Sequence, residues 1–576
     1  MITKEDINNT INKMILSASG WRGVFAACGD EESKSEEISP ALKIIFGAAA
    51  YVFNDYVRSQ TDSSRSKSKP VVFLGTDTRP TGKAIVEAII PVLLAVGCDV
   101  RYAGVIAAPE IMAWARNSNL FTTNQHEPTR TNAGFIYISA SHNPIGHNGI
   151  KFGLTDGGVL VPEEAAKLID SFRAFLDKDD CIDKIKSLTS GAEAGQLANV
   201  YNDIGSAKTE AFKAYYNFSL DVIWDGQFSM AAALKEILVK YPIGIVCDFN
   251  GSARTVSIDK ELFNSLGFKF ECINSEPGQI VHRIVPEGES LEPCCRLLEE
   301  ARLRDPSFVL GYVPDCDGDR GNLVIWDDTI NKARALEAQE VFALACVAEL
   351  SHLVCSGTDI SKAAVAINDP TSMRVDRIAE AFGISVFRAE VGEANVVSLA
   401  RKLREDGYLV RILGEGSAGG NITHPSAVRD PIHTVLAIAK MLSLPGLYEV
   451  WCKSSGQAEK YRDNFSLADV IASLPQFITT AAYNENAIMR IKTQDHALLK
   501  DRYQEVFLQE WEKREAELKE RFNICAWEAI AYIWMRGSAT EPVFRIMADV
   551  ETSDAAIERY LLDWQRYMIM VADNAC

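Results

Sequence analysis

The sequence lacks the cysteine patterns of a disulfide framework. It has 13 cysteines, an odd number, and none of them forms a Cys-x-x-Cys pair. Cys294 and Cys295 are adjacent, a spacing that rarely suits a bridge. The pattern is typical of reduced, partly buried thiols in a cytoplasmic protein.

Export and membrane signals are also missing. The chain begins Met-Ile-Thr-Lys-Glu-Asp, which is polar, and no signal peptide follows. The apolar stretch 84–96 contains Glu87 and Pro91 and is too short to span a bilayer. We therefore expect a soluble cytoplasmic protein that does not associate with a membrane.

Positive charge is scarce. The formal net charge is −19, which argues against a nucleic-acid partner, because such a protein needs a basic face. A local group of arginines can still hold a phosphate inside an acidic protein. The charge therefore favours a small-molecule partner.

What the sequence does contain is a repeated strand–helix rhythm. Its 576 residues are 47% hydrophobic and 24% charged, as in a globular protein of several domains. The rhythm occurs three times and predicts α/β domains with mixed sheets, followed by a smaller α+β C-terminal domain. The expected domains are 1–208, 209–335, 336–461 and 462–576. Within them we expect a turn around Arg22, a polar interdomain passage over 176–208, and an exposed, charge-laced helix over 498–521.

The first candidate functional loop follows the apolar strand 134–138. It reads Ser139-Ala-Ser-His-Asn-Pro, so Ser141 lies at a strand end, where α/β proteins carry their chemistry. A serine needs an assisting base or charge to act as a nucleophile, and His142 and Lys151 are near in sequence. The alternative is a turn that satisfies its own backbone. The loop is not the Gly-x-Ser-x-Gly turn of hydrolases.

The second loop, Asp315-Cys-Asp-Gly-Asp-Arg320, spaces three carboxylates two residues apart. Such carboxylates repel unless a hard cation lies between them. The EF-hand pattern fails because Trp326 stands at position twelve, so Mg²⁺ fits better than Ca²⁺. Two alternatives are a surface acidic turn and a haloacid-dehalogenase-like phosphatase with Asp315 as nucleophile.

Two further loops suit a phosphorylated sugar. Gly414-Glu-Gly-Ser417 offers carboxylate and hydroxyl groups on a backbone that a ligand can approach closely. Arg536-Gly-Ser-Ala-Thr-Glu-Pro542, with Arg545, offers arginine forks and hydroxyls for a phosphate. It is not a nucleotide P-loop, because no Gly-Lys-Ser/Thr is present. On its own, the Gly414–Ser417 stretch favours an ordinary glycine-rich turn.

Taken together and in this order, the four loops resemble those of the α-D-phosphohexomutases. Gly20-Trp-Arg-Gly-Val-Phe and Thr76-Asp-Thr-Arg also look like segments of that family. The resemblance implies four domains around a central cleft. The roles that it implies are a phosphoserine and metal ligand at Ser141, Mg²⁺ ligands at Asp315, Asp317 and Asp319, and groups facing the transferring phosphoryl group at Arg22, His142, Lys151 and Arg320. The implied substrate-binding residues are Gly392, Glu393, Glu415, Ser417, Arg536, Ser538, Thr540 and Arg545.

The implied activity is a phosphosugar mutase that moves a phosphoryl group between C1 and C6 of glucose or mannose. Mg²⁺ and glucose 1,6-bisphosphate would be its cofactors, and the enzyme would be a monomer or dimer. Glucosamine or pentose phosphates are alternative substrates, and a catalytically degenerate scaffold is an alternative function. Family members often carry His shortly after the sugar-loop Ser and Lys or His near Gly392. Here Ala418-Gly-Gly420 and Val391-Gly-Glu-Ala-Asn395 stand instead, so the group that transfers the proton stays open.

Overall fold

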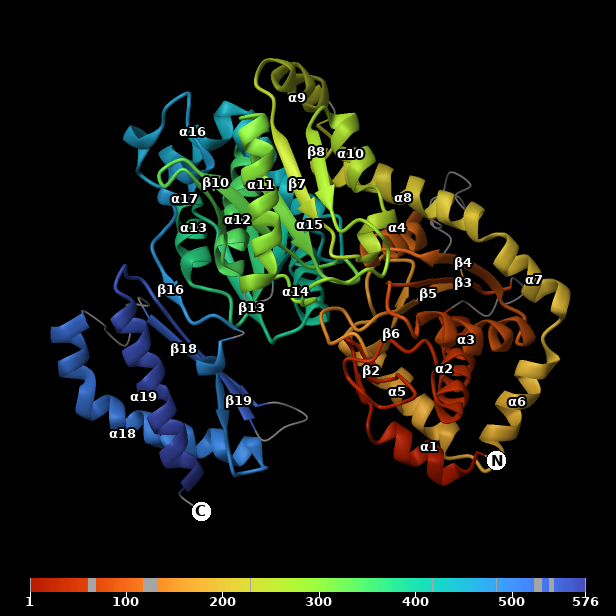
Figure 1. Cartoon of the computed structure of the whole chain (residues 1–576). Helices are drawn as coiled ribbons and strands as arrows, with labels where there is room; N and C mark the ends of the chain where they lie inside the picture. The colour runs from red at the N-terminus through yellow and green to blue at the C-terminus, as the bar shows by residue number, and fades with distance from the viewer. Residues whose placement is uncertain are drawn as a thin grey trace.

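The computed structural model describes residues 2–60, 69–117, 132–227, 229–416, 419–482, 484–522, 531–537 and 543–574. Four sheets follow one another along the chain (Figure 1). Ser417, Ser538 and Thr540 lie outside the described residues.

The first sheet has six strands in the order β1-β2-β6-β5-β3-β4. Its strands are β1 (Ile15–Ser17), β2 (Gly20–Val24), β3 (Val71–Thr76), β4 (Asp99–Val105), β5 (Ala133–Ile138) and β6 (His147–Leu154). The helices of this part are α1 (Lys4–Ile11), α2 (Pro40–Ser59), α3 (Gly82–Ala95), α4 (Ala108–Asn117), α5 (Pro162–Leu176), α6 (Cys181–Gly191), α7 (Ala194–Asn202) and α8 (Ile204–Trp224). Every residue of β5 is buried, as expected of a central strand covered on both faces.

The second sheet has the order β11-β10-β9-β7-β8. It consists of β7 (Gly244–Asp248), β8 (Lys269–Ile273), β9 (Phe308–Pro314), β10 (Gly321–Asp327) and β11 (Lys332–Ala335), with α9 (Ser229–Lys240), α10 (Asp259–Leu266) and α11 (Glu292–Arg304). The third sheet, β13-β12-β14-β15, consists of β12 (Ala364–Asn368), β13 (Ser385–Ala389), β14 (Ile412–Glu415) and β15 (Gly420–Thr423). Its helices are α12 (Ala338–Cys355), α13 (Arg374–Phe382), α14 (Glu393–Glu405), α15 (Pro431–Ser443) and α16 (Pro445–Ser454).

These three sheets share one pattern. In each, the first strand pairs in parallel with the second and the third, and a fourth strand returns antiparallel to the third. The four strands are β3, β4, β5 and β6 in the first sheet, β7 to β10 in the second, and β12 to β15 in the third. The turn between the third and fourth strands holds Ser141 in the first sheet and Asp315–Asp319 in the second, and in the third sheet it follows Glu415. Three of the four predicted loops therefore occupy one topological position.

The fourth sheet is different, since all its pairings are antiparallel to β19 (Val543–Val550). The partners are β16 (Ile478–Thr479), β17 (Ile488–Arg490) and β18 (Ala531–Gly537). The helices of this part are α18 (His496–Phe522) and α19 (Ala555–Asn574), which lie at the C-terminal end of the molecule in Figure 1. Helix α17 (Leu467–Ala472) precedes them in the chain but packs against α12 and β10. Short 3₁₀ helices span Ala253–Val256, Gly288–Leu291, Ala458–Lys460 and Glu485–Ala487. The predicted fold class, α/β with mixed sheets and a smaller α+β end, is confirmed.

Two local predictions were wrong. The expected turn around Arg22 is strand β2, which pairs with β6 and buries Trp21 between Phe152 and Phe172. The glycines on either side of Trp21 and Arg22 concealed this strand, because glycine is depleted in strands. The expected polar passage over 176–208 is mostly helical, and α6 packs against α2 and α3, burying Cys181 and Ile185 fully and Ile182 and Leu188 in part.

One helix within the described residues, α12, is long and apolar enough to cross a membrane. In the structure, 78% of its apolar window is buried inside the protein. It belongs to the core that surrounds the third sheet.

Candidate active site

Ser141 is held in a strained backbone conformation. Its φ is 52°, in the left-handed region that a residue with a side chain rarely adopts. The Ser141 amide donates to Ser139 Oγ at 2.8 Å, and the Ser141 hydroxyl donates to Asp315 Oδ2 at 2.6 Å. The turn of the first sheet therefore touches the turn of the second.

Arg79, which follows β3, holds this serine loop in shape. Its guanidinium donates to the carbonyl oxygens of Ser141, Asn143, Pro144 and His147. Arg79 is 3% exposed, and its Nε lies 3.2 Å from Asp77 Oδ2. The sequence showed this residue only as part of a family-like segment and did not reveal that it positions the loop.

His142 lies beside the candidate nucleophile, with Nδ1 3.3 Å from Ser141 Oγ. Burial lowers the pKa of His142 well below its usual value, and the positive charges of Arg320, Arg22 and Arg429 lower it further. The imidazole is therefore neutral at physiological pH and able to accept a proton.

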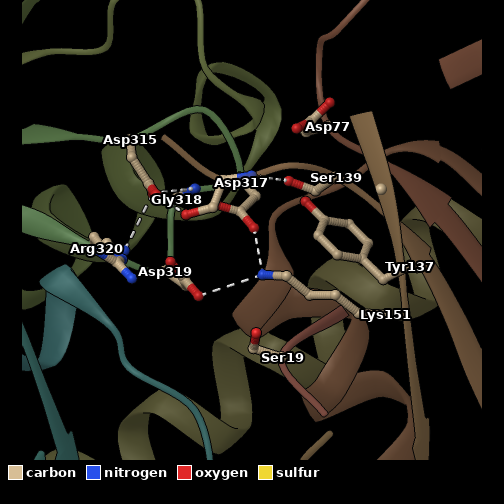
Figure 2. Close-up of polar contacts among 12 residues, drawn as sticks. Ser19, Asp77, Tyr137, Ser139, Lys151, Asp315, Asp317, Gly318, Asp319 and Arg320 are labelled. Carbon is tan, nitrogen blue, oxygen red and sulfur yellow. Dashed lines mark hydrogen bonds and ion pairs between the residues drawn. The ribbon is translucent and has the colours of Figure 1, made fainter. Parts of the chain in front are cut away.

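The three aspartates converge, as Figure 2 shows. The candidate ligand atoms of Asp315, Asp317 and Asp319 lie within 4.8 Å of one another, and all three side chains are buried. Asp317 Oδ1 and Asp319 Oδ1 are buried without a hydrogen-bond partner among the described residues. Buried carboxylate oxygens without partners fit a hard divalent cation, which would satisfy them.

The pKa values of Asp315 and Asp319 are shifted in opposite directions. Burial raises the pKa of Asp315 well above its usual value, and Asp317 and Asp319 raise it further. Burial also acts to raise the pKa of Asp319, but Arg429, Lys151 and Arg320 outweigh it and lower that pKa. The cluster thus carries concentrated negative charge that a metal ion would stabilise.

Lys151 reaches the aspartates from β6. Its Nζ lies 2.6 Å from Asp317 Oδ2 and 3.5 Å from Asp319 Oδ2 (Figure 2). Burial acts to lower the pKa of Lys151, but the two carboxylates outweigh it and leave the pKa raised. Lys151 is therefore a cation at neutral pH, which suits charge neutralisation better than proton abstraction.

Arg22 adds positive charge from β2, where it lies opposite Gly149 of β6. Burial lowers the pKa of Arg22, and the nearby charge of Arg320 lowers it further. The guanidiniums of Arg22 and Arg320 repel each other, so an anion such as a phosphoryl group between them would be stabilising.

Glu415, at the end of β14, is fully engaged by the protein. Its Oε1 accepts from Asn368 Nδ2 at 3.0 Å and from the Gly392 amide at 2.9 Å. Its Oε2 accepts from Arg429 Nη1 at 2.9 Å. In this conformation Glu415 joins the Gly392 segment to Arg429. The predicted contact requires a sugar hydroxyl to donate to a Glu415 oxygen that already accepts from the protein.

Arg429 is the residue that the sequence analysis missed most clearly. Its guanidinium forms ion pairs with Asp319 at 2.9 Å, Glu393 at 2.8 Å and Glu415 at 2.9 Å. A Cβ at Gly420 would lie 2.1 Å from Arg429 Cδ, so Arg429 occupies space that a side chain at 420 would fill. The lack of a side chain at Gly420 thus leaves the space that the buried side chain of Arg429 fills. The lone Arg before Asp430-Pro431 gave no signal in the sequence.

The predicted phosphate loop is described in part. Arg536 of β18 and Arg545 of β19 are cross-strand partners, and both residues are exposed. Neither side chain forms an ion pair within the described ranges. Two adjacent guanidiniums that lack a carboxylate there are suited to an anion.

Comparisons with known proteins agree with this geometry. The family pattern described as phosphoglucomutase/phosphomannomutase, alpha/beta/alpha domain I, matches residues 18–177, and that of domain III matches residues 340–457. The chain is 24% identical to a phosphoglucosamine mutase of Clostridium kluyveri over 92% of its length and 95% of that protein. It is 26% identical to a phosphoglucomutase/phosphomannomutase of Thermococcus kodakarensis over 93% and 96% of the two chains.

Solved structures share the fold. A phosphoglucomutase/phosphomannomutase family protein of Burkholderia thailandensis superposes with a TM-score of 0.61 at 16% identity, covering 100% of this chain and 99% of that one. The open form of parafusin, a phosphoglucomutase from Paramecium, superposes with a TM-score of 0.60 at 15% identity, covering 97% and 95%. The turn carrying Ser141, the aspartate cluster that it contacts and the matches to both domain patterns have one explanation: the chain belongs to the α-D-phosphohexomutase family.

Proposed function

We propose that the protein is a phosphosugar mutase that interconverts hexose 1-phosphates and 6-phosphates through a phosphoserine at Ser141. The observation that carries the proposal is the contact between Ser141 Oγ and Asp315 Oδ2, beside Lys151 and the other two aspartates. It supports the proposal because a serine hydroxyl, three carboxylates and an ammonium group lie together in one buried group, as a nucleophile, a metal site and a neutralising charge require. Glucose and mannose phosphates are the proposed substrates, and glucose 1,6-bisphosphate is the proposed intermediate and activator.

In the first step, phosphorylated Ser141 gives its phosphoryl group to the free sugar hydroxyl. The bond between phosphorus and the serine oxygen breaks, a bond to the sugar oxygen forms, and the proton of the sugar hydroxyl is transferred to the Ser141 oxygen. The bisphosphate then turns over, and its other phosphoryl group returns to Ser141 with the reverse bond changes. The second sugar phosphate is released.

The chain's own residues have distinct parts in these steps. Lys151, Arg22 and Arg320 neutralise the oxygens of the transferring group, and neutral His142 receives the Ser141 proton when the phosphoryl group returns. Asp315, Asp317 and Asp319 would hold Mg²⁺, which when bound withdraws charge from phosphoryl oxygens. Arg536 and Arg545 hold the phosphate that does not react. That clamp accepts either end of the sugar phosphate, because a phosphate presents the same oxygens in both orientations.

Glucosamine phosphate is a second candidate substrate, because several relatives carry the name phosphoglucosamine mutase. The decisive experiment incubates purified protein with Mg²⁺, a sugar 1-phosphate and a trace of the matching sugar bisphosphate. The substrates compared are the 1-phosphates of glucose, mannose, glucosamine and ribose. We expect 6-phosphate from glucose or mannose 1-phosphate. Conversion of the glucosamine ester alone would shift the assignment to that sugar, conversion of ribose 1-phosphate alone would shift it to a pentose, and no conversion of any would refute a mutase.

A further inference from the structure

A cavity of about 530 Å³ lies between the parts of the chain that carry the first and third sheets. Its walls are the end of α4, the turn after β6, the last turns of α14 and the segment 424–427 after β15. None of the residues proposed above for catalysis or substrate binding lines it. Its volume is in the range of small-ligand sites.

Three arginines from both sides face this cavity, namely Arg116 of α4 with Arg401 and Arg404 of α14. Asp156 pairs with Arg401 at 2.6 Å. Arg116 Nη1 donates only to the backbone oxygens of Asp156 and Pro425, each at 3.3 Å. Within the part of the chain that the structure describes, Arg116 and Arg404 have no carboxylate partner.

Arg404 is the least satisfied of the three. Its Nη2 donates to the Val410 carbonyl at 2.7 Å, while its Nε is buried without a partner among the described residues. Burial and the positive charges of Arg401 and Arg116 together lower the pKa of Arg404 to about 10, with burial the larger cause. An anion between the guanidiniums would remove both the repulsion and the unmet hydrogen bond.

His424 adds a neutral polar group to the same wall. Burial lowers its pKa to about 4, and Arg404, Arg411 and Arg116 contribute. The remaining wall combines the apolar Val397, Leu413, Pro425 and Ala427 with the polar Thr155 and Ser426 and the acidic Glu405. Guanidinium forks beside apolar side chains match a ligand with a phosphate group and a small organic body.

We propose that this interdomain cavity binds a small organic phosphate, whose oxygens are held by Arg116, Arg401 and Arg404. The site is distinct from the active site but shares elements with it. Helix α14 begins at Glu393, which pairs with Arg429, and the segment 424–427 leads directly to Arg429. A ligand here therefore braces the first and third sheets against each other at the level of the Arg429 cluster.

The alternative is that these arginines only stabilise the ends of α4 and α14, since cations are favourable at helix C-termini. Titration calorimetry on the full chain separates the two. The probe is phenylphosphonate, which has a phosphate-like head and an apolar ring but is no sugar. Malonate and inorganic phosphate test whether a dicarboxylate or the bare ion suffices.

The test variant is Arg401→Gln with Arg404→Gln, and the matched control is Lys402→Gln, which removes one charge from an exposed position of the same helix. We expect the double variant to weaken phenylphosphonate binding by about tenfold or more, and the control to change it less than about twofold. Malonate binding as tightly as phenylphosphonate would overturn the phosphate assignment. Equal affinity of wild type and double variant would overturn the site, as would an equal loss in the control.

Hydrogen exchange on the unmodified protein keeps the proposal testable if the double variant does not fold. Phenylphosphonate should slow exchange in 397–405 and 424–427. Protection confined to the segments around Ser141 and Asp315–Arg320 would show that the probe binds only at the active site and would overturn the proposal. The readouts do not use mutase activity, so they stand apart from the proposed reaction.

Discussion

The turns of the first three sheets and the arginine pair of the fourth sheet are attached to the molecule in different ways. Ser141, the aspartates and Glu415 are buried and joined by charged hydrogen bonds through Lys151 and Arg429. Arg536 and Arg545 are exposed. The fourth sheet is joined to the third part by several contacts. Asp549 accepts from Ser372 and from the Met373 amide, each at 2.8 Å, and Arg377 pairs with Glu551 at 2.8 Å. The proposed reacting half of the site is thus held by buried contacts, whereas the proposed phosphate clamp lies exposed on its own sheet.

The largest loss of activity is expected for Ser141→Ala, in the buried group that Ser141 forms with the aspartates. It removes the proposed phosphate carrier, so we expect mutase activity to fall by more than about a thousandfold. Intact mass should show a phosphate on the wild type that the variant lacks. Ser139→Ala is the control, since it removes a hydroxyl that accepts from the Ser141 amide and hydrogen-bonds Asp77 but leaves the Ser141 hydroxyl in place, so the variant should retain most of the phosphorylation. Full activity in Ser141→Ala would place the carrier elsewhere.

The second break concerns the aspartate cluster. Chelation should abolish activity and Mg²⁺ should restore it, whereas Asp317→Asn should lose at least about a hundredfold and resist restoration. The reason is that Asp317 also holds Lys151, so the variant loses a proposed ligand and misplaces a cation. Activity that persists in a chelator would contradict a metal-dependent site.

Arg429 links the loops of the second and third sheets. Arg429→Lys should keep the positive charge but lose the guanidinium that pairs with three carboxylates at once. We expect kcat to drop about 10- to 100-fold and the affinity for Mg²⁺ to fall, because Asp319 loses its partner. Gly420→Ala tests the same packing from the other side and should destabilise the protein by about 1–3 kcal/mol. Unchanged kcat and Mg²⁺ affinity in Arg429→Lys would show that the link is dispensable.

A change in the clamp should act on binding more than on chemistry. Arg545→Gln should raise KM by about tenfold with a smaller change in kcat, because its side chain is proposed to hold only the non-reacting phosphate. Arg559→Gln, at an exposed position of α19 in the same part, is a charge-matched control. A fall in kcat at constant KM would instead place Arg545 at the reacting phosphate.

The smallest effect is expected at the junction between the two halves. Asp549→Asn weakens two interdomain contacts and should increase hydrogen exchange in 372–375 and 478–480, with the first two sheets unchanged. Faster exchange throughout the protein would show that Asp549 supports the whole fold.

The sequence predicted the α/β rhythm and the loops because strand runs and the groups at their ends are local features. The structure adds that Ser141, Lys151 and the aspartates are in contact. The sequence did not predict strand β2, whose glycines hide its pairing, or helices α6 and α7, whose exposed faces are polar. Those elements are set by contacts between distant segments.

Arg79 and Arg429 were missed for a related reason. Each acts on groups that are distant in the chain: Arg79 reaches residues more than 60 positions away, and Arg429 reaches Asp319, 110 positions away. An arginine has no periodicity or spacing that reports such a role. Only the fold shows which carbonyls and carboxylates meet its guanidinium.

The shared position of three turns has a consequence for how such an enzyme changes over evolution. Ser141, Asp315–Asp319 and Glu415 each lie on a separate hairpin, so one can be altered without redesigning the others. Arg429 limits that freedom, because it binds the second and third hairpins at once. Selection for a new sugar therefore has to alter the third hairpin while preserving an acceptor for that arginine.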